Sequence, residues 1–183
     1  MKPSKLLLAA LTLSSLSLSG LHAENPIVGG GAMLPSTNIV ANAANSKDHT
    51  TLVAAVKAAG LVETLSSPGP FTVFAPTNAA FEALPDGTVE MLLKPENKDK
   101  LVAVLTYHVV TGDVSAEKLA AEITKTGGKA KLKTVNGEVL VASSPSPGKI
   151  NLTDSKGKVA TVTIADVKQS NGVIHVIDSV LLP

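Results

Sequence analysis

Histidine is the residue type in this sequence best suited to metal binding or proton transfer, because the chain contains no cysteine. Apart from His22, the histidines are His49, His108 and His175. Zinc sites normally take three or four protein ligands at recognisable spacings, and no two of these histidines lie within one helical turn. His108 follows the apolar face of a predicted helix and His175 lies inside an apolar strand. We therefore predict no metal site and two structural histidines bonded to backbone or hydroxyl groups, with metal binding and proton chemistry as the alternatives.

A serine hydrolase could be assembled on paper from His175, Asp178 and either Ser170 or Ser179. Along a strand, however, His175 and Asp178 point to opposite faces unless a bulge intervenes. The chain has no G-x-S-x-G turn to present an activated serine. The glycines at 29–31 lack the preceding strand and the following lysine of a phosphate-binding loop. We therefore predict that the protein is not an enzyme, and we assign it neither catalytic residues nor a cofactor.

Arginine is also absent, so every basic side chain is a lysine. The planar guanidinium that binds phosphate through two parallel hydrogen bonds is therefore missing. The net charge of the whole chain is +1, its lysines are scattered along the sequence, and aromatic residues make up only 2%. This composition argues against a nucleic-acid partner and against a tightly held phosphorylated ligand.

The first 23 residues have the order of a secretory signal peptide. Lys2 and Lys5 precede an apolar run, and Ala23 offers a small residue before a polar stretch. The run is shorter than the roughly 20 residues that cross a bilayer, so we predict cleavage after Ala23 and no membrane insertion. Removal leaves 160 of the 183 residues, a length that suits one domain, and their net charge is −1. We expect a secreted or periplasmic protein, and export without disulfides suggests a bacterial source.

Helical spacing dominates the chain up to residue 128. Residues 24–36 are rich in glycine and proline without apolar periodicity, which predicts a flexible N-terminal segment before a domain at 37–183. Asp48 is a suitable cap for a helix that ends at Gly60. Pro95 suits the first position of a helix that reaches His108. Shorter helices are predicted at 61–65, 77–84 and 116–123.

Strand patterns dominate from residue 129 onward. Two alternating runs flank Asn136-Gly137, which is a strong hairpin signal. Further strands are predicted at 148–154, 159–167 and 172–182, and one earlier strand at 71–75. Helices in the first half and antiparallel strands in the second predict a single α+β domain.

Three segments together resemble a fasciclin domain: FTVFAPTNAAFEAL (71–84), YHVV (107–110) and NGVIHVIDSVLLP (171–183). Their order and spacing fit this family over residues 37–183. The resemblance implies a wedge of two β-sheets with helices packed around it, in a secreted or surface module used for adhesion and matrix interaction. Asn78 stands where the family usually has Asp, and both residues cap helices. The residues that carry the family motif are Thr77, Asn78, His108, Asn171, Gly172 and His175.

The resemblance also implies a contact site. In animal matrix fasciclin domains, an acidic residue followed by an aliphatic one, shortly before the last strand, is tied to integrin binding. The matching pair here is Asp166-Val167, although Ala165 and Lys168 do not reproduce the animal motifs. Alternatively, Val167 packs inward and Asp166 bonds locally. We predict partner contact through Asp166 and Val167, and through Tyr107, whose ring we expect to be partly exposed.

Together these patterns predict a secreted module that binds a cell-surface or matrix protein. The alternative is a carrier of a small apolar or lipid-like ligand, held in a cleft between the helices and the sheets. A deep apolar pocket would favour the carrier, whereas an exposed apolar patch around residues 107–110 would favour contact with a protein.

Overall fold

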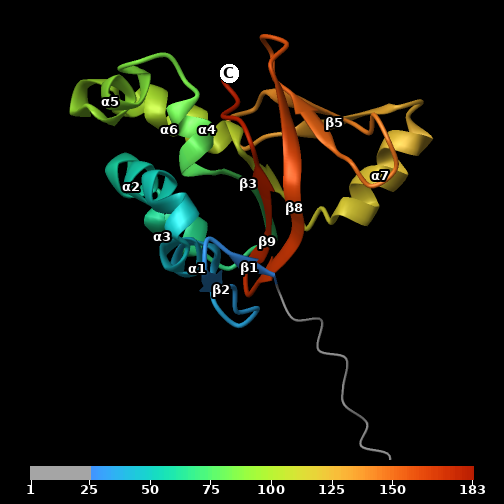
Figure 1. Cartoon of the computed structure of the whole chain (residues 1–183), viewed down its shortest axis with the longest axis horizontal. Helices are drawn as coiled ribbons and strands as arrows, with labels where there is room; N and C mark the ends of the chain where they lie inside the picture. Colours follow the sequence, from blue (N-terminus) through green and yellow to red (C-terminus); the bar gives the residue numbers. More distant parts are fainter. Residues whose placement is uncertain (1–25) are drawn as a thin grey trace, which may run out of the picture.

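The computed structural model describes residues 26–183 (Figure 1), so the predicted signal peptide at 1–23 lies outside the described residues. The described chain starts with a hairpin of β1 (Ile27–Val28) and β2 (Gly31–Ala32). Gly29 and Gly30 make its turn with φ values of 58° and 74°. Val28 and Met33 are buried in a hydrophobic core. Residues 27–33 are therefore packed onto the domain, in place of the flexible segment that the composition predicts.

Several of the helices begin where a polar side chain caps them. Thr77 accepts a hydrogen bond from the amide of Ala80, and Ser115 accepts one from the amide of Lys118. Asp48 does not cap the second α-helix as predicted, because it lies inside a 3-10 turn that Ser46 caps. The helices within residues 26–183 are α1 (Ile39–Asn45), η1 (Lys47–His49), α2 (Thr50–Ala59), α3 (Val62–Ser66), α4 (Asn78–Glu82), α5 (Thr88–Leu93), η2 (Pro95–Asn97), α6 (Lys98–Tyr107) and α7 (Ala116–Lys125).

Seven strands form one continuous order, β4-β3-β9-β8-β7-β6-β5. The 11-residue strand β8 joins two sheets, because its first three residues pair with β7 and the rest pair with β9. The two ends of this strand order also meet, because Val110 of β4 pairs with Thr134, the residue that follows β5. The predicted α+β wedge of two sheets is confirmed. The strands are β3 (Phe71–Pro76), β4 (Val109–Thr111), β5 (Lys129–Lys133), β6 (Val139–Ser143), β7 (Asn151–Thr153), β8 (Val159–Gln169) and β9 (Gly172–Ile177).

One pairing differs from the antiparallel pattern that the sequence predicts. Strand β9 pairs with β8 in the antiparallel sense but with β3 in the parallel sense, from Phe71 opposite Gly172 to Pro76 opposite Ile177. Both strands are buried on both faces, as strands of parallel pairs usually are. The C-terminal ends of β3 and β9 therefore lie side by side at the centre of the molecule (Figure 1).

Two hydrophobic cores lie on the two sides of β3. Val73 and Ala75 pack against the helices α1–α6, which cover one side of the molecule (Figure 1). Phe74, between them in sequence, points into the interior of the wedge. There Leu119 and Ile123 of α7 pack against the inner face of the second sheet. This alternation places α7 and the helical layer on opposite sides of the central strands.

Candidate functional site

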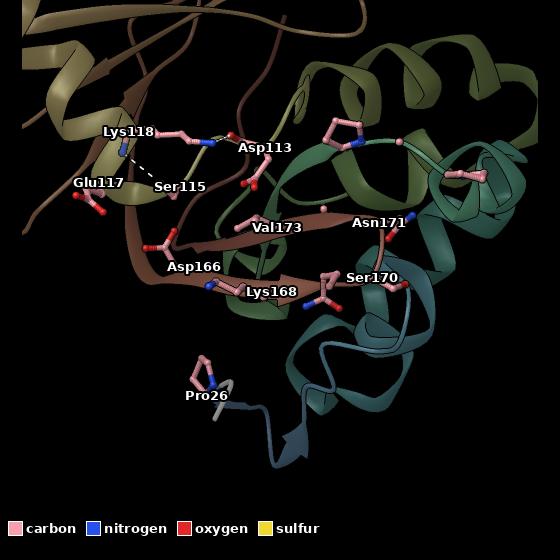
Figure 2. Close-up of a pocket in the computed structure, with 15 residues that line it drawn as sticks. Pro26, Asp113, Ser115, Glu117, Lys118, Asp166, Lys168, Ser170, Asn171 and Val173 are labelled. Carbon is pink, nitrogen blue, oxygen red and sulfur yellow. Dashed lines mark hydrogen bonds between the residues drawn. The ribbon is translucent and has the colours of Figure 1, made fainter. Parts of the chain in front are cut away.

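An open groove of about 970 Å³ lies where the end of β8, the start of β9 and the beginning of α7 meet (Figure 2). Its wall combines charged side chains with a short run of proline and glycine at 68–70. Three of the predicted contact and motif residues line it: Asp166, Asn171 and Gly172. The groove is therefore the candidate functional site.

Asp166 lies at an irregularity of β8, where the register with β9 shifts between Ile164 and Val167. Its φ of 58° is in the left-handed region, which Asp enters more readily than most residues. Oδ1 accepts a hydrogen bond from the amide of Ala116 at 2.8 Å. Because Ala116 begins α7, the carboxylate also faces the positive end of that helix dipole.

His175 joins two backbone segments beside the groove, at Val114 and at Asp166. Its Nε2 lies 2.7 Å from the carbonyl oxygen of Val114, and its Nδ1 accepts a hydrogen bond from the amide of Asp166 at 3.3 Å. A neutral ring protonated on Nε2 satisfies both contacts, because the carbonyl needs a donor and the amide needs an acceptor. Burial lowers the pKa of His175, although the bond to Val114 and the charges of Asp166 and Asp113 oppose that effect. The ring also stacks on Phe74 with centroids 5.6 Å apart.

The floor of the groove depends on the turn between β8 and β9. The side chain of Asn171 accepts a hydrogen bond from the amide of Ile39 at 3.0 Å and donates one to the carbonyl of Leu65 at 2.7 Å. Gly172 packs against β3 so closely that an added Cβ would lie 1.9 Å from the carbonyl oxygen of Phe71. Asn171 therefore joins this turn to the helices, and Gly172 permits the close pairing of β9 with β3.

The charged side chains of the groove come from three segments. Asp113 and Glu117 flank the start of α7, and Asp166 faces it from β8. Lys118 donates from Nζ to the backbone carbonyl of Asp113 at 2.8 Å, a contact drawn in Figure 2. With Lys168, the groove has three carboxylates and two ammonium groups. Such a surface can bind a polar partner through charge-assisted hydrogen bonds.

Two of the three predicted contact residues are buried in the structure. Val167 has no exposed surface (0%) and packs in the helical core. Tyr107 is likewise 0% exposed, and its hydroxyl accepts from the amide of Ser155 at 3.1 Å and donates to the carbonyl of Val139 at 3.4 Å. All of residues 107–110 are buried, so the exposed apolar patch expected there does not exist. Of the three, only Asp166 reaches a surface groove.

The other two histidines also bond to neighbouring protein groups. The Nδ1–H of His108 donates to the carbonyl of Val104 at 2.8 Å, and its Nε2 accepts from the amide of Leu181 at 3.0 Å. Burial lowers the pKa of His108 to about 4, so the ring is neutral at pH 7. The Nδ1 of His49 lies 2.9 Å from the hydroxyl oxygen of Ser46. Burial lowers the pKa of His49 as well.

The hydrolase constellation is not assembled. Asp178 accepts a hydrogen bond from the amide of Thr161 at 2.8 Å, and both nitrogens of His175 face backbone groups of other segments. Within residues 26–183, no group of three or more histidine, aspartate or glutamate side chains is placed to hold a metal ion. No helix in the same range has the length and the apolar content needed to cross a bilayer.

Thr77 and Asn78 act at two different helices. Thr77 caps α4, whereas Asn78 reaches the start of α2. Its Oδ1 accepts from the amide of Thr51 at 3.1 Å, and its Nδ2 donates to the carbonyl of Lys47 at 2.9 Å. An aspartate could make only the first of these bonds, since an ionised carboxylate has no donor. Asn78 therefore joins the two helices through both atoms of its amide.

The apolar cavity between the helices and the sheets is small. Side chains such as Ile39, Leu52, Phe74 and Leu105 line it, and its volume is about 30 Å³. Sites for small organic ligands span roughly 300–1,000 Å³. Among the described residues, this cavity offers no deep pocket of the kind that a carrier of an apolar ligand requires.

Sequence reasoning missed the residues that α7 brings to the groove. Asp113, Glu117 and Lys118 belong to no distinctive motif, and the sequence predicts only a short helix at 116–123 in this region. A positive φ at a non-glycine residue and a shift in strand register mark Asp166, and neither is visible in the sequence.

The fasciclin domain family model matches residues 47–183. Protein sll1483 of Synechocystis sp. is 51% identical over 162 residues, which cover 87% of this chain and 81% of that protein. Transforming growth factor-beta-induced protein ig-h3 of Sus scrofa is 43% identical over 135 residues, or 72% of this chain and 17% of that protein. A solved FAS1 domain pair from the insect cell adhesion molecule Fasciclin I matches with a TM-score of 0.55 and 25% identity, over 69% of this chain and 42% of that chain.

Proposed function

Since this chain belongs to the fasciclin domain family, we propose that it is a non-enzymatic binding module that attaches to a cell-surface or matrix protein outside the cytoplasm. The solved relative from the insect cell adhesion molecule Fasciclin I supports a role in adhesion. The predicted signal peptide at 1–23 supports an extracytoplasmic location.

The observation that carries the proposal is the fixed carboxylate of Asp166 in an open groove. One oxygen is bonded to the first amide of α7, and the backbone amide of the same residue is bonded to His175. Contacts of β8 with α7 and with β9 thus hold the carboxylate before any partner arrives. A pre-organised charged group loses little conformational entropy on binding, so it can contribute more to affinity than a mobile one.

The test is attachment of beads coated with the purified protein to the surface of the cells that produce it. In Asp166→Asn, the side-chain oxygen can still accept from Ala116 while the charge is lost. We expect attachment to fall about tenfold, because a charge-assisted hydrogen bond loses much of its strength when one partner becomes neutral. Val167 is unsuitable for such a test, since its side chain is buried.

Asp86→Asn is the matched control, because Asp86 is an exposed carboxylate on the helical side, outside the groove. It changes the net charge equally and should leave attachment unchanged. Equal attachment of wild type and Asp166→Asn, with both proteins folded, would contradict a contact at Asp166. Equal loss in both variants would indicate a general effect of net charge instead.

The extracytoplasmic location is tested by a separate measurement. Intact-mass analysis of the exported protein should give a chain that begins near Glu24. A dominant species that retains residues 1–23 would contradict both the predicted cleavage after Ala23 and the extracytoplasmic location.

A further inference from the structure

The net charge of this chain is close to zero, but its lysines and acidic residues are distributed unevenly along the sequence. Residues 26–123 contain six lysines and ten acidic residues, whereas residues 124–163 contain seven lysines and only two acidic residues, Glu138 and Asp154. The second range forms β5, β6, β7 and the first part of β8, together with the turns between them. The seven lysines are Lys125, Lys129, Lys131, Lys133, Lys149, Lys156 and Lys158.

Strand alternation sends three of these lysines to one side of the sheet. Lys129, Lys131 and Lys133 are exposed along β5, whereas Ala130 and Leu132 between them are buried in the wedge. Successive residues on one face of a strand are about 7 Å apart, so the ammonium groups form a regular row. The register continues this outward face across β6, β7 and residues 159–161 of β8. We call these outward side chains the lysine face.

The lysine face is open in the part of the chain that the structure describes. Helix α7 packs against the inner face of the sheet through Leu119 and Ile123, and it lies beside β5, far from α1–α6 (Figure 1). On the outer face, Val139 is 43% exposed and Val159 is 47% exposed. Within residues 26–183, the ammonium groups of the β5 lysines form no ion pair.

Behind the lysine row, the face carries hydrogen-bonding groups but no aromatic ring. Ser143, Asn151 and Thr161 lie in register with Lys129, and Thr153 lies in register with Lys131. Hydroxyl and amide groups can bond to sugar hydroxyls, whereas single-stranded nucleic acids need aromatic platforms for their bases. Without arginine there is no bidentate grip on phosphate. An open sheet face with a row of cations suits an extended polymer better than a small molecule.

A second copy of the chain is a poorer match for this face. The acidic residues of α4, α5 and η2 are interspersed with Lys94, Lys98 and Lys100, so the helical side offers no continuous negative surface. We propose that the lysine face docks a linear, carboxylate-bearing polysaccharide. This surface is separate from the groove at Asp166, and its occupancy does not depend on the proposed function of that groove.

The test is titration of the purified protein with polygalacturonate over a series of NaCl concentrations. The triple variant Lys129→Gln, Lys131→Gln, Lys133→Gln should bind at least about tenfold more weakly at low salt, because it loses three of the cations that displace counterions. Its slope of log K against log salt should also fall by about three, or about one for each lysine. Neutral dextran should not bind.

The matched control is Lys94→Gln, Lys98→Gln, Lys100→Gln, which removes the same charge from the helical side. Polygalacturonate binding should change less than about twofold in this control and in Asp166→Asn, because exposed charges more than a Debye length away are largely screened. Absence of binding by the wild type, or an equal loss in both lysine triples, would overturn the proposal. Tighter binding to phosphatidylglycerol vesicles or to a thymidine oligonucleotide than to polygalacturonate would overturn the choice of a polysaccharide.

Discussion

The groove at Asp166 and the lysine face are both exposed surfaces, but the chain builds them in opposite ways. The groove collects residues from 26, 68–70, 113–118 and 166–173, and backbone contacts of His175 and Asn171 hold it. The lysine face comes from one continuous stretch, 129–161, in which alternation alone sorts the side chains. One surface is a product of tertiary contacts and the other of strand periodicity.

This difference predicts how each surface responds to mutation. Groove residues also hold the fold, so most changes there should lower stability together with binding. The side chains of the lysine face make few contacts with the rest of the protein, so changes there should affect binding alone. Stability should therefore fall most for changes in and behind the groove and least for changes on the lysine face.

Gly172→Ala should have the largest effect. The new Cβ would lie 1.9 Å from the carbonyl oxygen of Phe71, so β3 and β9 must separate. We expect the free energy of unfolding to fall by about 3 kcal/mol or more, as for severe overpacking in a core. Urea unfolding measures this loss. Gly157→Ala is the control: its φ of 83° strains alanine, but no atom lies within 4 Å of its Cβ, so about 1 kcal/mol should be lost.

His175→Ala should cost somewhat less. It leaves a cavity beside Phe74 and removes the ring partners of the Val114 carbonyl and the Asp166 amide. We expect a loss of about 2–4 kcal/mol in the free energy of unfolding, together with weaker attachment through the groove. Polygalacturonate binding by the folded fraction should persist. A variant with wild-type stability would show that His175 is not a structural residue.

Mild acid should lower the free energy of unfolding, because buried histidines become protonated when the chain unfolds. The pKa of His108 is about 4 when folded, below its ordinary value of 6.5, so the unfolded chain takes up a proton first as the pH falls. Stability is therefore complete above pH 6.5 and is lost progressively down to pH 4. At pH 5, His108 should account for about 2 kcal/mol.

The measurement is the free energy of unfolding between pH 7 and pH 4. His175 and His49 should add losses of the same sign, because burial lowers their pKa values too. His108→Asn should be less stable at pH 7 but should show a shallower dependence on pH. An unchanged slope in that variant would contradict the assignment to His108.

Tyr107→Phe should have a modest effect, because it removes one hydroxyl beneath the second sheet. The amide of Ser155 then loses its acceptor and the carbonyl of Val139 loses a weak donor. We expect a loss of about 1 kcal/mol in thermal or urea unfolding. Attachment and polymer binding should both stay at the wild-type level, since the ring is buried.

The triple replacement of Lys129, Lys131 and Lys133 by Gln should have the smallest effect on stability. Exposed side chains without specific contacts usually contribute less than about 0.5 kcal/mol each. Urea unfolding should therefore give nearly the wild-type midpoint while polygalacturonate binding falls. A loss of several kcal/mol would show that the row supports the fold, and the contrast between the two surfaces would no longer hold.

Local patterns in the sequence determined the elements and the class of the fold. Thr77 and Ser115 cap helices, Gly60 ends α2 with a φ of 73°, and the runs around Asn136-Gly137 pair as a hairpin. These features are readable because each depends on residues within a few positions of one another. The motif segments at 71–84 and 171–183 also indicated the family, which the family model confirms.

Tertiary structure alone decided which residues reach the surface and which strands meet. The parallel pairing of β3 with β9 joins residues about a hundred positions apart, and no local pattern specifies that register. A shift in the pairing of β8 turns Asp166 toward α7 and leaves Val167 in the core. Contacts of Tyr107 with residues of the second sheet and its turns bury that ring. A one-residue change in register reverses the face of every side chain that follows. Exposure near a bulge therefore depends on long-range contacts, and these form only when the whole chain folds.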